Sequence, residues 1–261
     1  MNALTKHMFS WSRFHAACLA AVLALPVSFG AALPAYSFTP SSQERDLYLL
    51  IRADGEQRRV QVVLDPRLCN AARKHAADTQ RRKFFAHKNP DGVNPNQRVI
   101  NEGYPLPAHY AANQNYVESM AGSVVDTAAD ALKLWRGSPS HATHVFGKDA
   151  FYREQVVLGV GRAPASGHGY ATYVFISAPG PVGQTWSATA RVMRRAQVVI
   201  DTTGMVTLSS LQPQTILEIW TSPTLQAWAF QQTIVVGPGG SADVGLRSVP
   251  RGFIRMGYYQ P

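Results

Sequence analysis

The sequence predicts an α+β protein, and two observations support this prediction. Apolar residues recur at helical spacing through much of residues 41–147, whereas the later segments are short and rich in β-branched and aromatic residues. Helices followed along the chain by strands are typical of the α+β class. With 261 residues and 46% hydrophobic content, the chain can form one large domain or two modest ones.

Residues 1–35 are typical of a secretory signal peptide. Basic residues precede the apolar run AACLAAVLALPVSFG, and small residues around Ala32 and Ala35 offer cleavage points. This run is shorter than the roughly 20 residues that cross a bilayer, and no later run is long enough, so we expect no transmembrane span in the mature chain. Removal of the segment leaves only Cys69, which excludes an internal disulfide and predicts a buried thiol. We expect a periplasmic or secreted protein.

The first helices are predicted by their start signals and periodicity. One helical pattern covers residues 41–55. In LDPRLCNAARKHAADTQRRKFF, Asp65 can cap a second helix and Pro66 suits its first position. One face of this second helix carries Leu68, Ala71, Ala72, His75, Ala76 and Thr79. We therefore expect a well-packed helix that ends near FFAHKNPDG.

Shorter helices are expected further along. One covers about residues 97–102, and the irregular polar segment YPLPAHYAANQNYVESMAG follows it. Another covers about residues 126–135 and closes at Gly137. SPSHATHVFG predicts a short helix that starts at Ser138 and stops at Gly147.

Strand patterns occupy the rest of the chain. EQVVLGVGR and YATYVFISA, separated by APASGHG, predict a hairpin. The Gly/Pro break PGPVGQ separates residues 41–180 from a tail, residues 184–261, whose short strand-like runs predict a small all-β, sandwich-like domain. Pairing of the tail strands with the first unit is the alternative. Because each side of the break has its own apolar pattern, we expect residues 41–180 to fold without the tail.

Charge and motifs exclude several classes of protein. The net charge is +9, but the basic residues form short groups without interleaved aromatic residues, so we expect no nucleic-acid partner. The chain has no Gly-rich phosphate loop, CxxC pair, serine nucleophile elbow or HExxH helix. The corresponding reaction classes therefore lose support.

Three polar residues on separate elements are candidates for a site. His87 follows the second helix, Glu118 lies in the irregular segment, and His141 begins the short helix. Taken singly, each has a structural alternative: His87 as a helix cap, Glu118 as a surface carboxylate and His141 packed against the hairpin. His141 and His144, three residues apart, share a helical face and could chelate a metal.

Five spaced motifs resemble a known family in their order: LDPRLCNAARKHAADTQRRKFFAHKNPDG, VESMAG, LWRGSPSH, LGVGR and YATYVF. They resemble the bacterial, SCP-like extracellular branch of the CAP superfamily, named for cysteine-rich secretory proteins, antigen 5 and pathogenesis-related proteins. The resemblance covers about residues 45–179. It implies an α-β-α sandwich whose cleft is lined by His87, Glu118 and His141.

The resemblance also implies a chemistry for this cleft. Two neutral imidazoles and a carboxylate suit a zinc ion with a position left for water, and equally suit acid/base work near neutral pH. The chain departs from the family pattern at Val117-Glu118-Ser119, where GEN is usual, and after Trp135, where many members have a second glutamate. His144 could supply the missing ligand. The expected zinc ligands are thus His87, Glu118, His141 and His144.

Two functions are left open. The first is a binding protein of the cell envelope or exterior, whose cleft takes up a lipid, glycan or peptide. The second is a metal-assisted hydrolase of envelope polymers. A glycosidase needs two carboxylates, and only Glu118 is well placed, with Asp91 a distant second. No serine or cysteine nucleophile stands beside the histidines, so we prefer binding; Trp220 or Trp228 in the tail could stack on sugars, although such residues are more often core.

Overall fold

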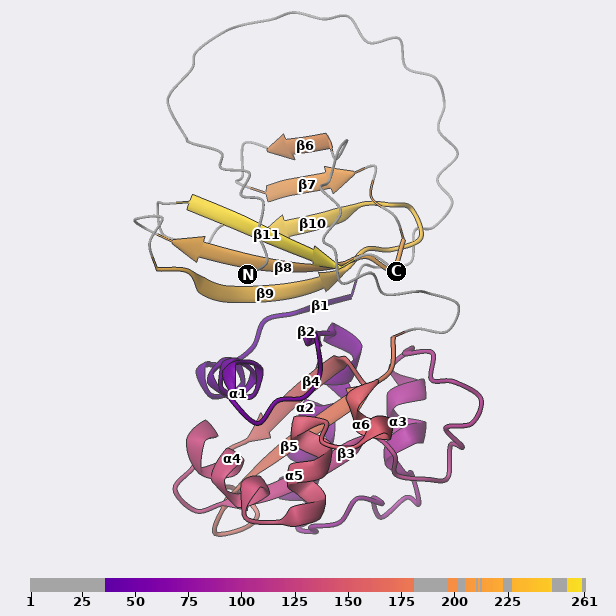
Figure 1. Cartoon of the computed structure of the whole chain (residues 1–261), viewed down its shortest axis with the longest axis vertical. Helices are drawn as coiled ribbons and strands as arrows, with labels where there is room; N and C mark the ends of the chain where they lie inside the picture. Colours follow the sequence, from indigo (N-terminus) through magenta and orange to yellow (C-terminus); the bar gives the residue numbers. More distant parts are fainter. Residues whose placement is uncertain are drawn as a thin grey trace, which may run out of the picture.

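The computed structural model describes residues 36–180, 197–200, 205–209, 211, 213–222, 227–245 and 253–259 (Figure 1). The expected signal peptide, residues 1–35, lies outside the described residues. None of the helices that the structure describes has the length and apolar character needed to span a membrane.

The helices are α1 (Ser42–Ala53), α2 (Pro66–Arg82), α3 (Pro95–Asn101), α4 (Ala128–Arg136), α5 (Pro139–Phe146) and α6 (Ala150–Arg153). The strands are β1 (Tyr36–Phe38), β2 (Val63–Leu64), β3 (Glu118–Ser123), β4 (Val157–Ala163), β5 (Ala171–Ala178), β6 (Gln197–Ile200), β7 (Met205–Ser209), β8 (Ile216–Ser222), β9 (Ala229–Val235), β10 (Ala242–Gly245) and β11 (Phe253–Tyr259). The expected helices are present within a few residues, whereas α6, β1, β2, β3 and β10 were not predicted.

The helix ends follow local chemistry. The Asp65 side chain accepts from the backbone N–H of Arg67 and Pro66 opens α2, as expected. The helix stops at Lys83, whose φ of 54° is left-handed. Gly147, with a φ of 60°, ends α5 in the same way. The stop of α2 leads into the segment that carries His87, whereas His141 and His144 lie within α5.

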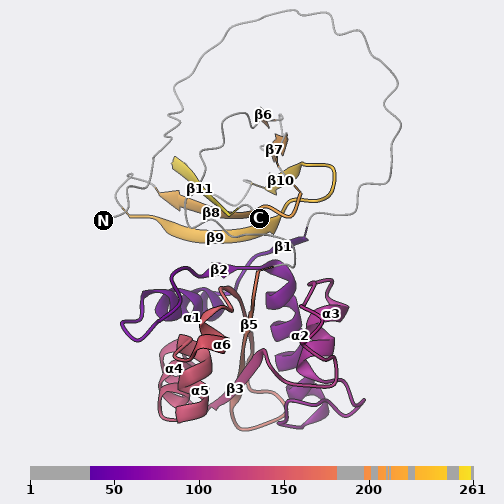
Figure 2. The same ribbon diagram turned by 45° about the vertical axis from the view of Figure 1, so that its right-hand side comes forward.

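A four-stranded sheet of order β2-β4-β5-β3 forms the middle layer of the first unit, with β2 parallel to β4 and the other pairs antiparallel. Helix α2 covers one face, and α1, α4 and α5 cover the other (Figure 2). Alternate residues of β5 serve the two faces: Tyr173 and Phe175 lie on the α1 side, and Val174 and Ile176 on the α2 side. The expected α-β-α sandwich is confirmed.

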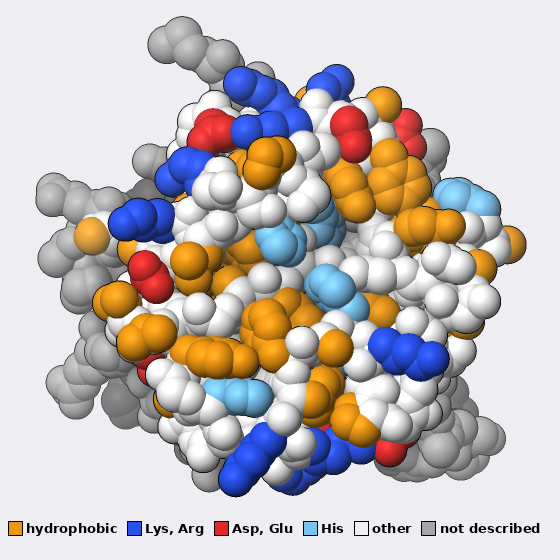
Figure 3. Space-filling view, turned by 90° about the horizontal axis from the view of Figure 1, so that it is seen from below, with side chains coloured by type: hydrophobic (Ala, Val, Ile, Leu, Met, Phe, Trp, Pro, Cys, Tyr) orange, Lys and Arg blue, Asp and Glu red, His pale blue; other side chains and the backbone are white. Residues whose placement is uncertain are grey.

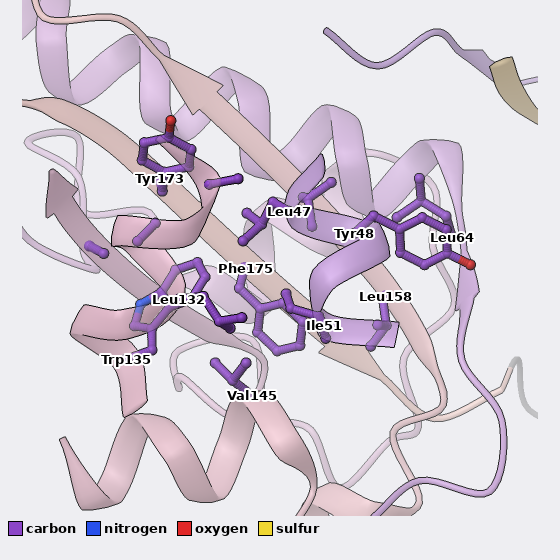
Figure 4. Close-up of a cluster of buried hydrophobic side chains, with 14 of the residues drawn as sticks. Leu47, Tyr48, Ile51, Leu64, Leu132, Trp135, Val145, Leu158, Tyr173 and Phe175 are labelled. Carbon is purple, nitrogen blue, oxygen red and sulfur yellow. The ribbon is translucent and has the colours of Figure 1, made fainter. Parts of the chain in front are cut away.

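The core on the α1 side is aromatic and aliphatic (Figure 4). Trp135 of α4 lies against Phe175 with ring centroids 6.1 Å apart. Figure 4 shows Leu47 and Ile51 of α1 and Val145 of α5 in the same buried cluster. Because this cluster draws on three helices and the sheet, it fixes α5, which carries His141.

Two glycines allow α2 to lie close to the sheet. A Cβ at Gly159 would stand 2.4 Å from the backbone carbon of Leu68, and one at Gly161 would stand 2.2 Å from the backbone nitrogen of Arg73. Side chains at either position would push the helix away, so the LGVGR motif is a packing requirement of the α2 face.

The tail forms two sheets, β1-β9-β8-β11 and β10-β7-β6. Their buried cluster includes Leu208 from the smaller sheet with Leu217, Ile219 and Ile234 from the larger one. The expected small sandwich-like tail is therefore present. Its larger sheet contains a strand that the sequence did not predict, since β1 precedes the first unit and pairs antiparallel with β9.

The two units share buried contacts. Ile216 and Val235 of the tail belong to the α2-side core, and the Phe230 ring lies 5.6 Å from that of Tyr48 in α1. Tyr48 Oη donates to the buried Glu218 Oε1 at 2.6 Å. The boundary between residues 41–180 and 184–261 stays a prediction, but independent folding would expose apolar surface on both sides.

Candidate functional site

His87 and Glu118 come together although they are expected on different elements. After α2 the chain passes through Phe84 and Phe85 to His87, and a turn closed by Gly92 (φ 82°) follows. Nδ1 of His87 lies 2.8 Å from Oε1 of Glu118, the first residue of β3. The side chain of His87 is 41% exposed. The turn thus holds one side of the imidazole against a carboxylate and leaves the other side open.

Glu118 is buried, at 5% exposure, and both carboxylate oxygens are engaged. Arg98 Nη2 of α3 donates to Oε2 at 2.6 Å, and His75 Nε2 lies 3.8 Å from Oε1. Burial opposes ionisation of Glu118, but the hydrogen bond from His87 and the charge of Arg98 outweigh it and lower the pKa of the carboxyl. Glu118 is therefore an ionised structural centre, not the surface carboxylate of the simpler alternative.

The carboxylate sets the protonation pattern of His87. An ionised Glu118 only accepts hydrogen bonds, so Nδ1 of His87 carries the proton that it donates. In the neutral ring Nε2 is then the free lone pair, on the exposed side of the side chain. His87 can accept a hydrogen bond from a ligand or bind a cation through this atom.

His75 of α2 contacts the segment that carries His87. Its Nε2 lies 3.1 Å from the carbonyl oxygen of Ala86, and its side chain is fully buried in α2. Burial lowers the pKa of His75, and the neighbouring Glu118 only partly opposes this effect. His75 and Arg98 were missed as site residues. His75 is visible in the sequence only as one position in the apolar stripe of α2, and Arg98 has no local signal at all.

His141 is carried by α5. It is half-buried, and burial lowers its pKa, as does the positive charge of His87. Such an effect acts over several ångströms, so it puts the two side chains in the same region of the molecule. Histidine side chains gather near the middle of the lower face, beside apolar ones (Figure 3). His141, whose pKa is lowered, thus lies within electrostatic range of the partly exposed His87.

His144 has a different role from the one expected. It is buried, with Nδ1 2.7 Å from Ser119 Oγ and Nε2 2.9 Å from Ser177 Oγ. Burial and the charge of Arg59 hold its pKa well below the usual value. Because both ring nitrogens are used by hydroxyls in the core, His144 attaches α5 to β3 and β5 and has no lone pair directed at the surface.

The donors do not fit a four-ligand zinc site. His144 is engaged in the core, and Glu118 already shares its oxygens with His87 and Arg98. Of the four expected ligands, only His87 and His141 have partly exposed imidazoles. Within the residues that the structure describes, no group of three or more His, Cys, Asp or Glu is arranged to hold a metal ion. Zinc binding stays a prediction that would now rest on two histidines.

Aromatic side chains lie next to this region. Tyr152 of α6 contacts His144, with ring centroids 4.5 Å apart, and Phe151 stacks on Tyr110 at 5.5 Å. Tyr116, two residues before Glu118, meets the Phe151 ring at 5.8 Å. Phe151 is 39% exposed. The cluster of Tyr110, Tyr116, Phe151 and Tyr152, here called the aromatic cluster, therefore contacts the buried His144 and has one partly exposed ring, that of Phe151.

Other residues singled out in the sequence lie elsewhere. Asp91 is exposed and pairs with Arg82 at 2.7 Å, away from Glu118. Cys69 is buried, and burial raises the pKa of its thiol well above the ordinary value, as expected for an unreactive side chain. Trp220 packs against Phe230 at 5.2 Å and is part of the core edge. No second carboxylate joins Glu118 from these positions.

Comparison with known proteins identifies the first unit. The family model for the cysteine-rich secretory protein family, CAP, matches residues 51–177. An outer surface protein from Borrelia burgdorferi is 17% identical with a TM-score of 0.41, covering 56% of this chain and 98% of that one. An extracellular protein containing a SCP domain from Bacillus anthracis is 18% identical with a TM-score of 0.41, over 51% of this chain and 40% of that one.

No curated protein matches the chain at a significant level. The chain spans less than half of the Bacillus anthracis protein, so that protein extends well beyond the shared domain. The match over residues 51–177 agrees with the α-β-α sandwich and with the order of the five sequence motifs. Residues 51–177 are thus a domain of the cysteine-rich secretory protein family.

Proposed function

We propose that the protein is a secreted or envelope-associated binding module that takes up a glycan at His87 and His141. The proposal of secretion rests on the signal-peptide pattern of residues 1–35. The proposal of binding rests on one observation above the others: Glu118 holds Nδ1 of the partly exposed His87 ring, which leaves Nε2 as the acceptor of the neutral ring, within electrostatic range of His141.

The state of Glu118 favours binding over hydrolysis. A glycosidase acid must hold a proton near neutral pH, but the pKa of Glu118 is lowered despite its burial. Its oxygens are held by His87 and Arg98, so it cannot reach a scissile bond without breaking a buried ion pair. The second candidate function, a metal-assisted hydrolase, has no specific observation in its favour.

The surroundings of the two histidines favour a glycan among the possible ligands. Sugar hydroxyls donate hydrogen bonds to neutral imidazole nitrogens, and the apolar faces of sugar rings stack on aromatic side chains. The aromatic cluster contacts α5, the helix of His141, through Tyr152 and His144, and its Phe151 ring is 39% exposed. A lipid chain would gain little from the polar groups, and a peptide would need no aromatic platform.

Calorimetric titration with a tetramer of N-acetylglucosamine, a soluble piece of an amino-sugar polymer, tests the proposal. We expect His87→Ala and His141→Ala to weaken binding about tenfold each, the effect of about 1.4 kcal/mol for one lost hydrogen bond. Lys133→Ala, which truncates an exposed side chain of α4 away from the pair and from the aromatic cluster, serves as the control and should change nothing. Phospholipid vesicles and an unstructured peptide are the competing probes.

Three results would contradict the proposal. Binding of vesicles or peptide, but not of the tetramer, would assign another ligand class. Equal affinity in the wild type and in His87→Ala would remove the site. Cleavage of the tetramer, followed by mass spectrometry, would favour the hydrolase.

A further inference from the structure

A buried arginine holds the C-terminal end of α5. Arg59 lies in the loop between α1 and β2, and only 5% of the residue is exposed. Its Nη2 donates to the carbonyl oxygen of His144 at 2.7 Å, and its Nη1 donates to that of Val145 at 2.7 Å. The backbone N–H of Arg58 donates to the carbonyl oxygen of Phe146 at 2.8 Å. This loop thus pairs three of the carbonyls that a helix leaves free at its C-terminus.

The same guanidinium also reaches the sheet. Nε of Arg59 donates at 2.7 Å to the carbonyl oxygen of Gln155, which lies two residues before β4. Nη2 donates to Ser177 Oγ of β5 at 3.2 Å, and Nη1 donates to Gln57 Oε1 at 3.2 Å. All five N–H groups of the side chain therefore have an acceptor. One planar group ties the end of α5 to β5 and to the start of β4.

The chemistry of these contacts distinguishes Arg59 from a residue that only fills space. Its five acceptors are all uncharged: three carbonyl oxygens, one amide and one hydroxyl. Burial lowers the pKa of Arg59 to about 9, and Asp149 only partly opposes this effect, so the side chain is charged at neutral pH. An apolar side chain would fill the same space without the cost of burying a charge. What the fold gains from arginine is a rigid fork of five donors, which no other side chain provides.

The end of α5 leaves room for this fork. Gly147 ends the helix with a φ of 60°, and a Cβ there would stand 2.9 Å from Cγ and 3.2 Å from Cζ of Arg59. Any side chain at this position would therefore crowd the arginine away from the carbonyls that it binds. Gly147 thus both allows the left-handed stop of α5 and admits the Arg59 side chain.

We infer that Arg59 is a positioning residue of the candidate site: it fixes the last turn of α5 against the sheet and thereby sets where His141 stands relative to His87. The carbonyls that it binds belong to the residues three and four positions after His141, on the same side of the helix. For ligand affinity this inference rests on the proposed function. The placement of His141 itself can be measured without any ligand.

NMR titration of the histidine rings in the mature chain measures this placement. The charge of His87 contributes to the lowered pKa of His141, so His87→Ala should raise the pKa of His141. The size of this rise is compared between the otherwise wild-type chain and Arg59→Lys, as in a double-mutant cycle. Lysine keeps the charge but has one nitrogen in place of the fork, so it cannot reach all five acceptors. Arg58→Lys makes the same change at the exposed neighbouring position and is the matched control.

Two more variants separate positioning from stability. Gly147→Ala crowds the guanidinium while leaving the arginine in place, so it tests the inference independently and decides it if Arg59→Lys does not fold. Val174→Ala truncates the core on the α2 face of the sheet and shows the effect of lost stability alone. We expect the effect of His87 on His141 to fall to less than half in the first two variants and to stay unchanged in both controls. Affinity for the N-acetylglucosamine tetramer should fall several-fold in the same two variants.

Three results would overturn the inference. The first is an unchanged effect of His87→Ala on His141 in Arg59→Lys and Gly147→Ala. The second is an equal loss in Val174→Ala, because the effect would then report stability alone. The third is no rise at all in the otherwise wild-type chain, since His141 would then lie out of range of His87. A tetramer that does not bind the wild type would refute the proposed function only, because the titration decides the placement of His141 by itself.

Discussion

Replacing Glu118 by glutamine removes the negative charge at the centre of the candidate site while keeping its shape. In the wild type this charge faces Arg98 Nη2 at 2.6 Å and His87 Nδ1 at 2.8 Å. The Arg98 side chain is 10% exposed, so after the change its guanidinium would lie largely out of water without a counter-ion. In either orientation the NH2 of the glutamine amide would, in addition, face one of these two donors.

The size of the effect follows from this geometry. Removal of one partner of a buried ion pair costs about 3–5 kcal/mol, because the other charge stays buried and unpaired. For a chain of this size, such a loss lowers the midpoint of thermal unfolding by roughly 10 °C. Glu102→Gln is the matched control, since Glu102 pairs with Lys74, whose side chain is 69% exposed. A pair of that kind contributes about 0–1 kcal/mol.

The pH dependence gives a sharper test than the magnitude alone. Because the pKa of Glu118 is lowered in the folded state from its ordinary value of 4.5, its charge stabilises the fold fully above that value. This contribution is lost as the pH falls through the lower, folded-state pKa. The free energies of unfolding of the wild type and Glu118→Gln should therefore differ at pH 7 and converge in acid.

Urea unfolding followed by circular dichroism, at pH 7 and at a series of lower pH values, measures this difference. The reasoning is refuted if Glu118→Gln is no less stable than Glu102→Gln at pH 7. It is also refuted if the gap between the wild type and Glu118→Gln stays constant down to the lowest pH at which both fold.

Three further outcomes are expected. Gly161→Ala should lower the free energy of unfolding by about 1–3 kcal/mol, because the added Cβ would collide with the backbone of α2. Gly169→Ala should not, since no neighbouring atom lies within 4 Å of the added Cβ. Equal stability of the two variants in urea unfolding at neutral pH would contradict this. A chain that ends at Gly180 should melt lower than the full chain and bind a hydrophobic dye, since it lacks Phe230 and the other tail contacts; identical melting would show instead that the first unit is independent. Zinc should bind weakly, with an affinity that falls below about pH 6.5 as the imidazoles take up protons, and His144→Ala should leave the calorimetric heat unchanged; a heat lost in that variant would contradict the core role of His144.

Elements with local signals could be predicted from the sequence. Helix α2 begins with a cap and a proline and repeats apolar residues at helical spacing, so its bounds follow from nearby residues alone. Strand β3 could not be predicted in this way. Its sequence, ESMAGS, has no β-branched residues and little alternation, and it is a strand because β5 pairs with it and α4 and α5 pack against it.

The candidate site was predictable to a similar extent. His87, Glu118 and His141 could be predicted because they lie in motifs that resemble those of a known family. The structure does bring Glu118 to His87. The role of His144 could not, because its partner Ser177 lies 33 residues away on β5. Arg98 could not be predicted for the same reason. Its role depends on its contact with Glu118, and no sequence pattern around residue 98 indicates that contact.

Strand β1 has a consequence for how the chain reaches its final form. Residues 36–38 are the first that the structure describes, yet they complete a sheet through residues 233–235 of β9. Contacts between such distant parts of a chain form late, because the intervening loop must close first. Strand β1 therefore stays unpaired until β9 has formed and the loop between them has closed. During this interval the edge of β9 that β1 later covers is exposed. We expect this interval, more than the folding of either unit, to decide whether the protein refolds or aggregates.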